Sequence, residues 1–183
     1  MAKPLLSAET IYEAALSLLD SGGSDALTAR NLATALRCST RTLYQQVGKR
    51  DQLIEQLLAY HLQNLKLNFQ AKSSWQQSAA RWAGDLRKAL LTHPNLYRLM
   101  TTAHRAPVAA YADELYKVLI RAGFEGATAL RACRAFTHVS IDLTLSELHA
   151  SRDAPARTPQ RRVPQEFADT VRWLIAGLEA ELT

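Results

Sequence analysis

The chain has 183 residues, of which 48% are hydrophobic and 21% charged, and its formal net charge is +5. This composition is ordinary for a globular protein with a hydrophobic core, and it excludes a disordered chain and a small scaffold that depends on disulfides. No run of eighteen apolar residues occurs and the N-terminal residues lack the apolar stretch of a signal peptide, so we expect a cytoplasmic protein with no membrane partner.

Helix signals in chain order predict four helices in the first 69 residues. The second is short, over 28–36, the third covers about 40–46, and the fourth runs from residue 50 to 69. The residues expected to start or end these helices are Ser7, Gly22, Gly23, Thr28, Ser39 or Thr40, Gly48 and Arg50.

The rest of the chain also has helical periodicity. We expect helices over 73–92, after Pro94, from Pro107 to Gly123, over 126–149 and over 165–181, with an exposed loop at 150–164 that is rich in proline and arginine. No sustained alternation of apolar and polar residues predicts a strand. The fold class is therefore all-α, with about nine helices.

Residues 28–47 have the pattern of a helix-turn-helix motif, in which a tight turn holds two short helices and the second presents its outer face to the DNA major groove. In the second helix Leu43 and Val47 are expected to point inward. Five basic residues and no acidic one occur from Thr28 to Arg50, as a phosphate backbone requires. We expect hydrogen-bonding side chains on the outer face to read bases: Thr40, Arg41, Thr42, Gln45 and Gln46.

The segments 27–33 (LTARNLA) and 42–53 (TLYQQVGKRDQL) make this region similar to the DNA-binding domain of the tetracycline-repressor (TetR-like) family. The resemblance covers about residues 7–58, and segments 91–96 and 121–124 resemble that family's ligand-binding half. It implies a DNA-binding domain at 1–50, a connecting fourth helix at 50–69, and a regulatory and dimerisation domain at 70–183. By resemblance, the residues that contact phosphates are Thr28, Arg30, Tyr44, Lys49 and Arg50.

One position departs from the family pattern. The turn of the motif usually carries glycine, and this chain has Arg37 there. A non-glycine residue in the left-handed conformation costs roughly 1–2 kcal/mol.

The resemblance further implies a homodimeric repressor that binds a palindromic DNA operator and is released by a small-molecule inducer. Two-fold symmetry also has a physical reason, since one recognition helix makes too few contacts for tight binding. Candidates for the dimer seam, and equally for the monomer core, are Leu130, Phe136, Leu174 and Leu178. Candidates for the ligand pocket are His61, Trp82, Tyr97, Met100, His104, Tyr111, His138 and Asp142.

Other functions stay open at this stage. An enzyme is disfavoured because no catalytic or phosphate-binding motif occurs, and we expect no cofactor. We expect no metal site either, since Cys38 and Cys133 lie far apart without the spacing of metal ligands. A ligand-independent or architectural DNA-binding protein and a transcriptional activator fit the same residues. If Asp142 were buried, it would require a partner such as His138 or a cationic ligand.

Overall fold

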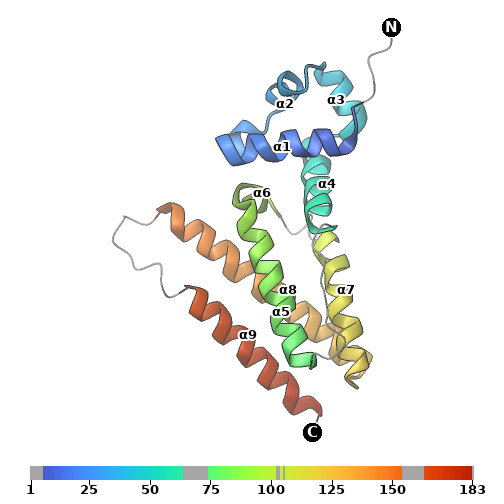
Figure 1. Cartoon of the computed structure of the whole chain (residues 1–183), viewed down its shortest axis with the longest axis vertical. Coiled ribbons are helices and arrows are strands. Elements are labelled where there is room, and N and C mark those ends of the chain that lie inside the picture. Colours follow the sequence, from blue (N-terminus) through green and yellow to red (C-terminus); the bar gives the residue numbers. More distant parts are fainter. Residues whose placement is uncertain (1–5, 64–73, 102–103, 105, 154–162, 183) are drawn as a thin grey trace. The chain divides into compact units, whose positions relative to one another are not determined.

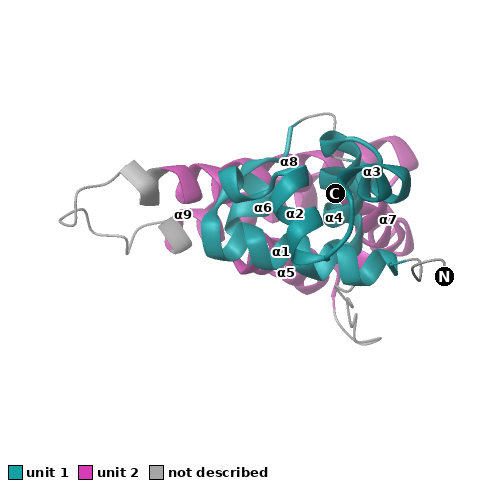
Figure 2. Ribbon diagram, turned by 90° about the horizontal axis from the view of Figure 1, so that it is seen from above, with its two compact units in different colours: residues 1–62, 93–107 teal, residues 63–92, 108–183 magenta. Residues whose placement is uncertain are grey.

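The computed structural model describes residues 6–63, 74–101, 104, 106–153 and 163–182, and all regular structure in these ranges is helical. The prediction of an all-α fold is confirmed. The chain divides into two compact units, Met1–Leu62 with His93–Pro107, and Gln63–Thr92 with Val108–Thr183 (Figure 1 and Figure 2). None of the helices in the described ranges is both long and apolar enough to cross a membrane.

Unit 1 contains the helices α1 (Ala8–Gly22), α2 (Ala29–Ala35), α3 (Thr40–Val47), α4 (Arg50–Gln63) and α6 (Pro94–Arg98), with the short 3-10 helix η1 (Ser24–Ala26) after α1. Serine and threonine caps begin the first three helices: the side chains of Ser7, Thr28 and Ser39 each accept a hydrogen bond from a backbone N–H three residues later. The helices close over a core of fully buried side chains that includes Leu19, Leu32, Leu43, Leu57 and Leu58.

The turn between α2 and α3 is a Schellman motif. The N–H of Cys38 donates to the carbonyl of Ala33 over 2.9 Å, and the N–H of Arg37 donates to that of Thr34 over 3.1 Å. Arg37 lies in the left-handed region with φ of 50°, and it is the only non-glycine residue with positive φ among the described residues. The motif is therefore built with an arginine at the position where glycine is usual.

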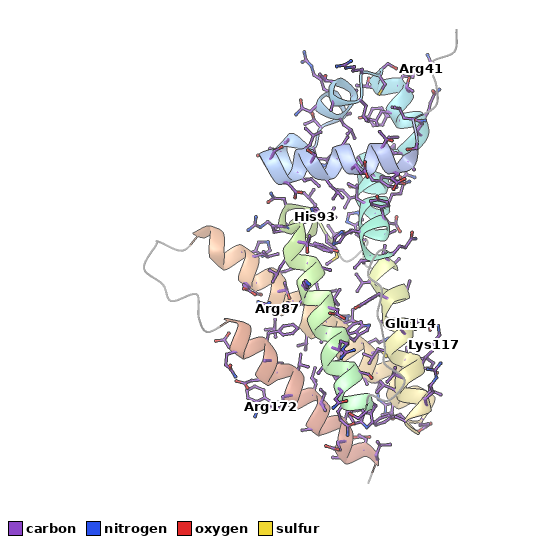
Figure 3. The ribbon with its side chains drawn as sticks, in the orientation of Figure 1. Arg41, Arg87, His93, Glu114, Lys117 and Arg172 are labelled. Carbon is purple, nitrogen blue, oxygen red and sulfur yellow. The ribbon has the colours of Figure 1, made fainter. Side chains whose placement is uncertain are left out.

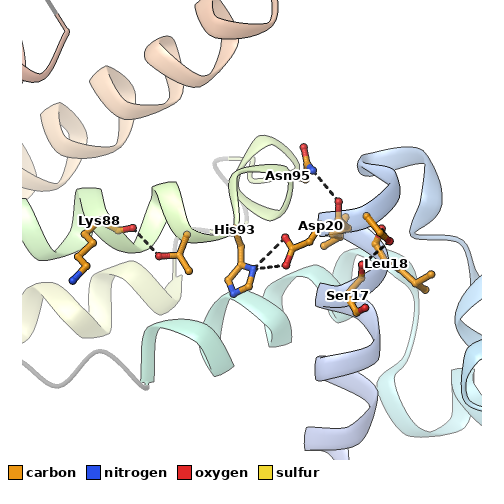
Figure 4. Close-up of polar contacts among 9 residues, drawn as sticks. Ser17, Leu18, Asp20, Lys88, His93 and Asn95 are labelled. Carbon is orange, nitrogen blue, oxygen red and sulfur yellow. Dashed lines mark hydrogen bonds and ion pairs between the residues drawn. The ribbon is translucent and has the colours of Figure 1, made fainter. Parts of the chain in front are cut away.

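Helix α6 belongs to unit 1 although it lies between two helices of unit 2 in the sequence. Figure 4 shows the contacts that attach it to α1: His93 Nδ1 lies 2.9 Å from Asp20 Oδ2, and Asn95 Nδ2 donates to the carbonyl of Leu19 over 2.8 Å. The expected boundary at residue 70 lies outside the described residues. The structure adds that the segment 93–107 packs with the N-terminal helices.

Unit 2 contains α5 (Trp75–Thr92), most of α7 (Ala106–Arg121), α8 (Gly126–Asp153) and α9 (Val163–Glu179), followed by a 3-10 helix η3 (Ala180–Leu182). Helix α5 packs against both α8 and α9. Arg87 on α5, which Figure 3 labels, pairs with Glu147 on α8 over 2.6 Å and lies over the ring of Phe167 on α9. The guanidinium of Arg87 thus links α5 to both α8 and α9.

Both ends of the segment expected as an exposed loop, 150–164, are helical, and residues 154–162 lie outside the described residues. Helix α8 continues to Asp153, and α9 begins at Val163 with Pro164 in its first turn. Proline is tolerated there because the backbone nitrogen of a first-turn residue has no hydrogen-bond partner within the helix. The predicted helix at 50–69 is described as far as Gln63, and 64–69 lies outside the described residues.

Candidate DNA-binding surface

Helix α3 has one buried face and one exposed face. Leu43 and Val47 are almost completely buried, whereas Thr40, Arg41 and Gln45 are exposed. Figure 3 shows Arg41 on α3. Arginine can form two hydrogen bonds with guanine and glutamine two with adenine, so the exposed face presents groups that recognise bases in the major groove.

Two further residues predicted to read bases are engaged within the protein. The hydroxyl of Thr42 lies 2.8 Å from Ser39 Oγ in the helix cap. The side chain of Gln46 donates through Nε2 to the backbone carbonyl of Leu6 over 3.1 Å, and its Oε1 is buried without a hydrogen-bond partner. Sequence reasoning missed the Gln46 contact because it joins residues 40 positions apart and leaves no periodic signal.

A cleft of about 230 Å³ lies beside α3, among α2, α3 and the start of α4. Its walls are buried leucines and Val47, and its lining also includes four exposed residues predicted to contact phosphates: Thr28, Tyr44, Lys49 and Arg50. Tyr44 is 50% exposed. The structure therefore brings these four residues together, whereas Arg30 is exposed on α2 and is not part of the lining.

The cleft is suited to an anion. It includes the first residue of α4, a helix of 14 residues whose dipole places partial positive charge at that end. Gln52 Oε1 accepts the backbone N–H of Lys49 over 2.8 Å, which fixes the start of the helix. Arg50 donates from Nη2 to the carbonyl of Ser24 over 3.2 Å, so its guanidinium is held across the end of η1.

The turn that leads into α4 requires glycine. Gly48 has φ of 72°, and a Cβ added there would lie 2.1 Å from Gln52 Oε1. A side chain at residue 48 would therefore displace the amide that caps α4, and with it Lys49 and Arg50.

The predicted ligand-pocket residues fall into three groups. His61, Tyr97, Met100 and His104 lie in unit 1, Trp82 and Tyr111 in the core of unit 2, and His138 and Asp142 on the exposed side of α8. The structure therefore does not bring all eight together within one unit.

In unit 1 the ring of His61 packs edge-on against His93 and Tyr97, with centroid distances of 4.8 and 5.9 Å. Tyr97 is fully buried and its hydroxyl has no hydrogen-bond partner, and burial raises the pKa of this phenol above its usual range. Nearby, the buried His104 accepts the backbone N–H of Thr101 at Nδ1 over 3.2 Å.

In unit 2 the rings of Trp82 and Tyr111 stack at 5.1 Å, and the indole N–H of Trp82 donates to the carbonyl of Tyr111 over 3.1 Å. These aromatic residues are core residues whose polar atoms are engaged with each other. Asp142 is exposed rather than buried, so its charge carries no desolvation penalty that a ligand must offset.

A groove of about 310 Å³ runs between α8 and α9 of unit 2. Phe136, Leu174 and Leu178 line it, and Leu130 on α8 is 46% exposed. Phe136 itself is buried within the unit. The largest exposed side chain in the groove is Trp173 of α9, which is 64% exposed and is not one of the four seam candidates.

Among the described residues, no group of three or more histidine, cysteine, aspartate or glutamate side chains is arranged to hold a metal ion.

Comparison with known proteins agrees with this architecture. The family described as "Tetracyclin repressor-like, C-terminal domain" matches residues 70–173. An HTH-type transcriptional regulator of Saccharopolyspora erythraea is 31% identical over 147 residues, which cover 79% of this chain and 62% of that regulator. The tetracycline repressor protein class E of Escherichia coli is 34% identical over 148 residues, which cover 78% of this chain and 69% of that protein.

Among solved structures, a TetR variant from Acinetobacter baumannii AYE in complex with minocycline superposes with a TM-score of 0.81 at 25% identity, over 97% of this chain and 99% of that chain. Its fold matches over both units. From the family match and the relatives together, the chain belongs to the tetracycline repressor-like family of helix-turn-helix transcriptional regulators.

Proposed function

We propose that this protein is a transcriptional repressor that binds an operator in duplex DNA as a homodimer and leaves it when a small molecule binds. The observation that carries the proposal is the arrangement on one side of unit 1, where the exposed face of α3 lies beside the cleft that gathers Thr28, Tyr44, Lys49 and Arg50. In this proposal, the side chains that would read bases lie next to a cleft that would take a phosphate.

Dimerisation is supported by the groove between α8 and α9. A largely exposed Trp173 lines a groove that a second copy could fill, and aromatic residues of this kind often dominate interfaces. Leu130 on α8 is half-exposed as well. Two copies of α3 related by two-fold symmetry would contact two half-sites, as a palindromic operator requires.

Release by a ligand is supported by the relatives and by α6. The A. baumannii structure contains minocycline, and the E. coli relative is a tetracycline repressor. In this chain α6 directly follows α5 of unit 2, while His93 and Asn95 attach it to α1. Ligand-induced movement of α5 would therefore act on the N-terminal helices, and His61, Tyr97, Met100 and His104 are the pocket candidates nearest this segment.

Selection of duplexes from a random library tests the DNA-binding part. The wild type should enrich a palindromic sequence. Arg41→Ala should relax the base preference, whereas Arg50→Ala should weaken binding to all sequences about equally and reduce the salt dependence. Arg50→Lys serves as the matched control because it keeps the charge. Equal loss of sequence preference in both alanine variants would contradict the division of roles.

A reporter placed behind the selected sequence separates repression from activation. Release is then measured with a panel of charged and neutral small molecules, minocycline included, added to the protein–DNA complex. If none of them lowers DNA affinity or raises the melting temperature, the ligand-independent regulator becomes the better description.

A further inference from the structure

The short helix η1 holds two residues of the cleft beside α3. The carbonyl of Ser24 in η1 accepts a hydrogen bond from Arg50 Nη2 over 3.2 Å. The carbonyl of Ala26, also in η1, accepts the backbone N–H of Thr28 over 2.9 Å. Arg50 and Thr28 are therefore attached to backbone atoms of η1, and the position of η1 decides where the guanidinium of Arg50 lies.

The end of α1 determines the position of η1. The N–H of Gly23 donates to the carbonyl of Leu19 over 2.9 Å, and Gly23 has φ of 70°, so the chain leaves α1 in one defined direction. Helix η1 then lies directly against the last turn of α1, because a Cβ added at Gly22 would be only 2.6 Å from the Cβ of Ala26. A shift of this last turn would therefore move η1 with it.

Helix α6 acts on the same end of α1. Asn95 Nδ2 donates to the carbonyl of Leu19 over 2.8 Å (Figure 4), so this carbonyl accepts hydrogen bonds from both α6 and Gly23. Asn95 Oδ1 accepts a hydrogen bond from Arg98 Nη1 over 2.9 Å, which fixes the orientation of the amide. Helix α6 also contacts η1 directly. One carbonyl of α1 thus joins α6 to the turn that leads into η1.

A guanidinium that is held in place before DNA arrives can bind phosphate at a lower cost. An arginine side chain has many rotamers, and the loss of this freedom on binding opposes the contact with phosphate. Arg50 is exposed, and its bond to Ser24 removes part of that freedom in the protein without DNA. Displacement of η1 would restore the freedom and so lower the affinity for DNA.

We propose that Asn95 is a positioning residue that couples α6 to the cleft beside α3. Asn95 fixes the end of α1, and η1 in turn holds Arg50 where it meets the DNA backbone. The proposal rests on the proposed function and adds to it the route by which α6 acts on phosphate binding. Displacement of α6 would weaken DNA binding through Arg50, while the base preference of α3 stays the same.

The test measures the affinity of full-length variants for the duplex that the wild-type protein enriches from a random library. We expect Asn95→Ala to weaken binding about 2- to 30-fold, the range for substitutions that transmit an effect through a network of contacts. The substitution should have little further effect in an Arg50→Ala background, because the guanidinium is already absent there. It should have its full effect in an Arg41→Ala background.

The two backgrounds separate coupling from a loss of stability. A substitution at Asn95 that only lowers the amount of folded protein weakens binding by the same factor in the Arg50→Ala and Arg41→Ala backgrounds. Asn95→Asp keeps an acceptor for Arg98 but, when ionised, cannot donate to Leu19. An effect that Asn95→Asp shares with Asn95→Ala therefore belongs to the bond with Leu19.

A second perturbation moves η1 without changing α6. Gly22→Ala places a methyl group against Ala26, so it should displace η1 and weaken binding with the same dependence on Arg50. Ser21→Ala is the matched control in the same turn of α1. The hydroxyl of Ser21 donates to the carbonyl of Ser17 over 2.7 Å within α1, so its removal should leave DNA affinity unchanged.

Three results would overturn the proposal: unchanged affinity in both Asn95 variants, an equal loss in the Arg50→Ala and Arg41→Ala backgrounds, or an altered base preference in Asn95→Ala. If the Asn95 variants do not fold, Gly22→Ala decides in their place, and an equal loss in the two backgrounds overturns the proposal there too. If the wild-type protein enriches no duplex at all, the proposed function itself fails, and this result is distinct from the other three.

Discussion

Replacement of Arg37 by glycine should make the protein more stable and at the same time weaken its binding to DNA. Arg37 occupies the left-handed position of the Schellman motif between α2 and α3, with φ of 50°. A non-glycine residue in this conformation costs roughly 1–2 kcal/mol, and Arg37→Gly removes that cost. The greater freedom of glycine in the unfolded chain offsets about 0.4–1 kcal/mol, which leaves a net gain of about 0.8 kcal/mol between the midpoints of the two ranges.

Chemical denaturation followed by circular dichroism should detect this gain as a higher midpoint with an unchanged slope. All three tryptophans, Trp75, Trp82 and Trp173, lie in unit 2, so tryptophan fluorescence reports unfolding of that unit and serves as an internal control. Amide hydrogen exchange should show the added protection in residues 28–47. In a cooperative unfolding of the whole chain, the gain corresponds to about 1–4 °C in melting temperature.

Arg37→Ala is the matched control. It removes the same charge but keeps a Cβ in the left-handed conformation, so its stability should stay within about 0.5 kcal/mol of the wild type. Both variants should lose the same salt dependence of DNA binding, because Arg37 is an exposed cation of the motif and the loss follows the charge and not the backbone. A glycine variant no more stable than the alanine variant would refute the claim that the turn is strained.

Three further predictions concern the core, the cysteines and the dimer. Leu43→Ala should destabilise the protein by about 2–5 kcal/mol, because this leucine is 2% exposed. Urea denaturation measures the loss of stability. A loss below about 1 kcal/mol would contradict the role of Leu43 in packing α3 against the core. Burial, and to a lesser extent Asp113, raises the pKa of the Cys133 thiol to about 12, so this thiol is protonated at neutral pH. A thiol reagent should therefore label the half-buried Cys38 first and Cys133 only after denaturation. Equal labelling rates of the two cysteines in the folded protein would argue against the buried position of Cys133. Trp173→Asp should yield a folded monomer, because an unpaired charge in the groove between α8 and α9 opposes association. Light scattering measures the mass, and an unchanged dimer mass would mean that the dimer interface lies elsewhere.

The parts of the structure that local sequence signals specify were predictable. Thr28 caps α2 as expected, Leu43 and Val47 point into the core at helical spacing, and the strained turn at Arg37 occurs where the motif demands a left-handed residue. These features depend on residues within about one turn of one another, so periodicity and caps carry the information.

Features that depend on long-range packing were not predictable. The bond from Gln46 to Leu6 joins positions 40 residues apart, and the exposed position of Asp142 depends on which face of α8 the other helices cover. Nor does the sequence indicate that α6 would pack against α1, because the bond between Asn95 and the carbonyl of Leu19 spans 76 positions. In each case the packing of the helices determines which residues meet, and neither segment carries a sequence pattern that indicates the contact.

The division of the chain limits how a ligand could act on α3. The chain passes between the units three times, after Leu62, after Thr92 and after Pro107. The first passage lies one residue before the described end of α4 at Gln63, and the third lies two residues into α7. The second passage is at His93, whose backbone is not helical, with φ of −126° and ψ of 69°, and whose position depends on the contact with Asp20. Movement of α5 can thus act on α1 through His93 while the Asp20–His93 contact is intact, so we expect the ligand response to be more sensitive to this pair than DNA affinity itself.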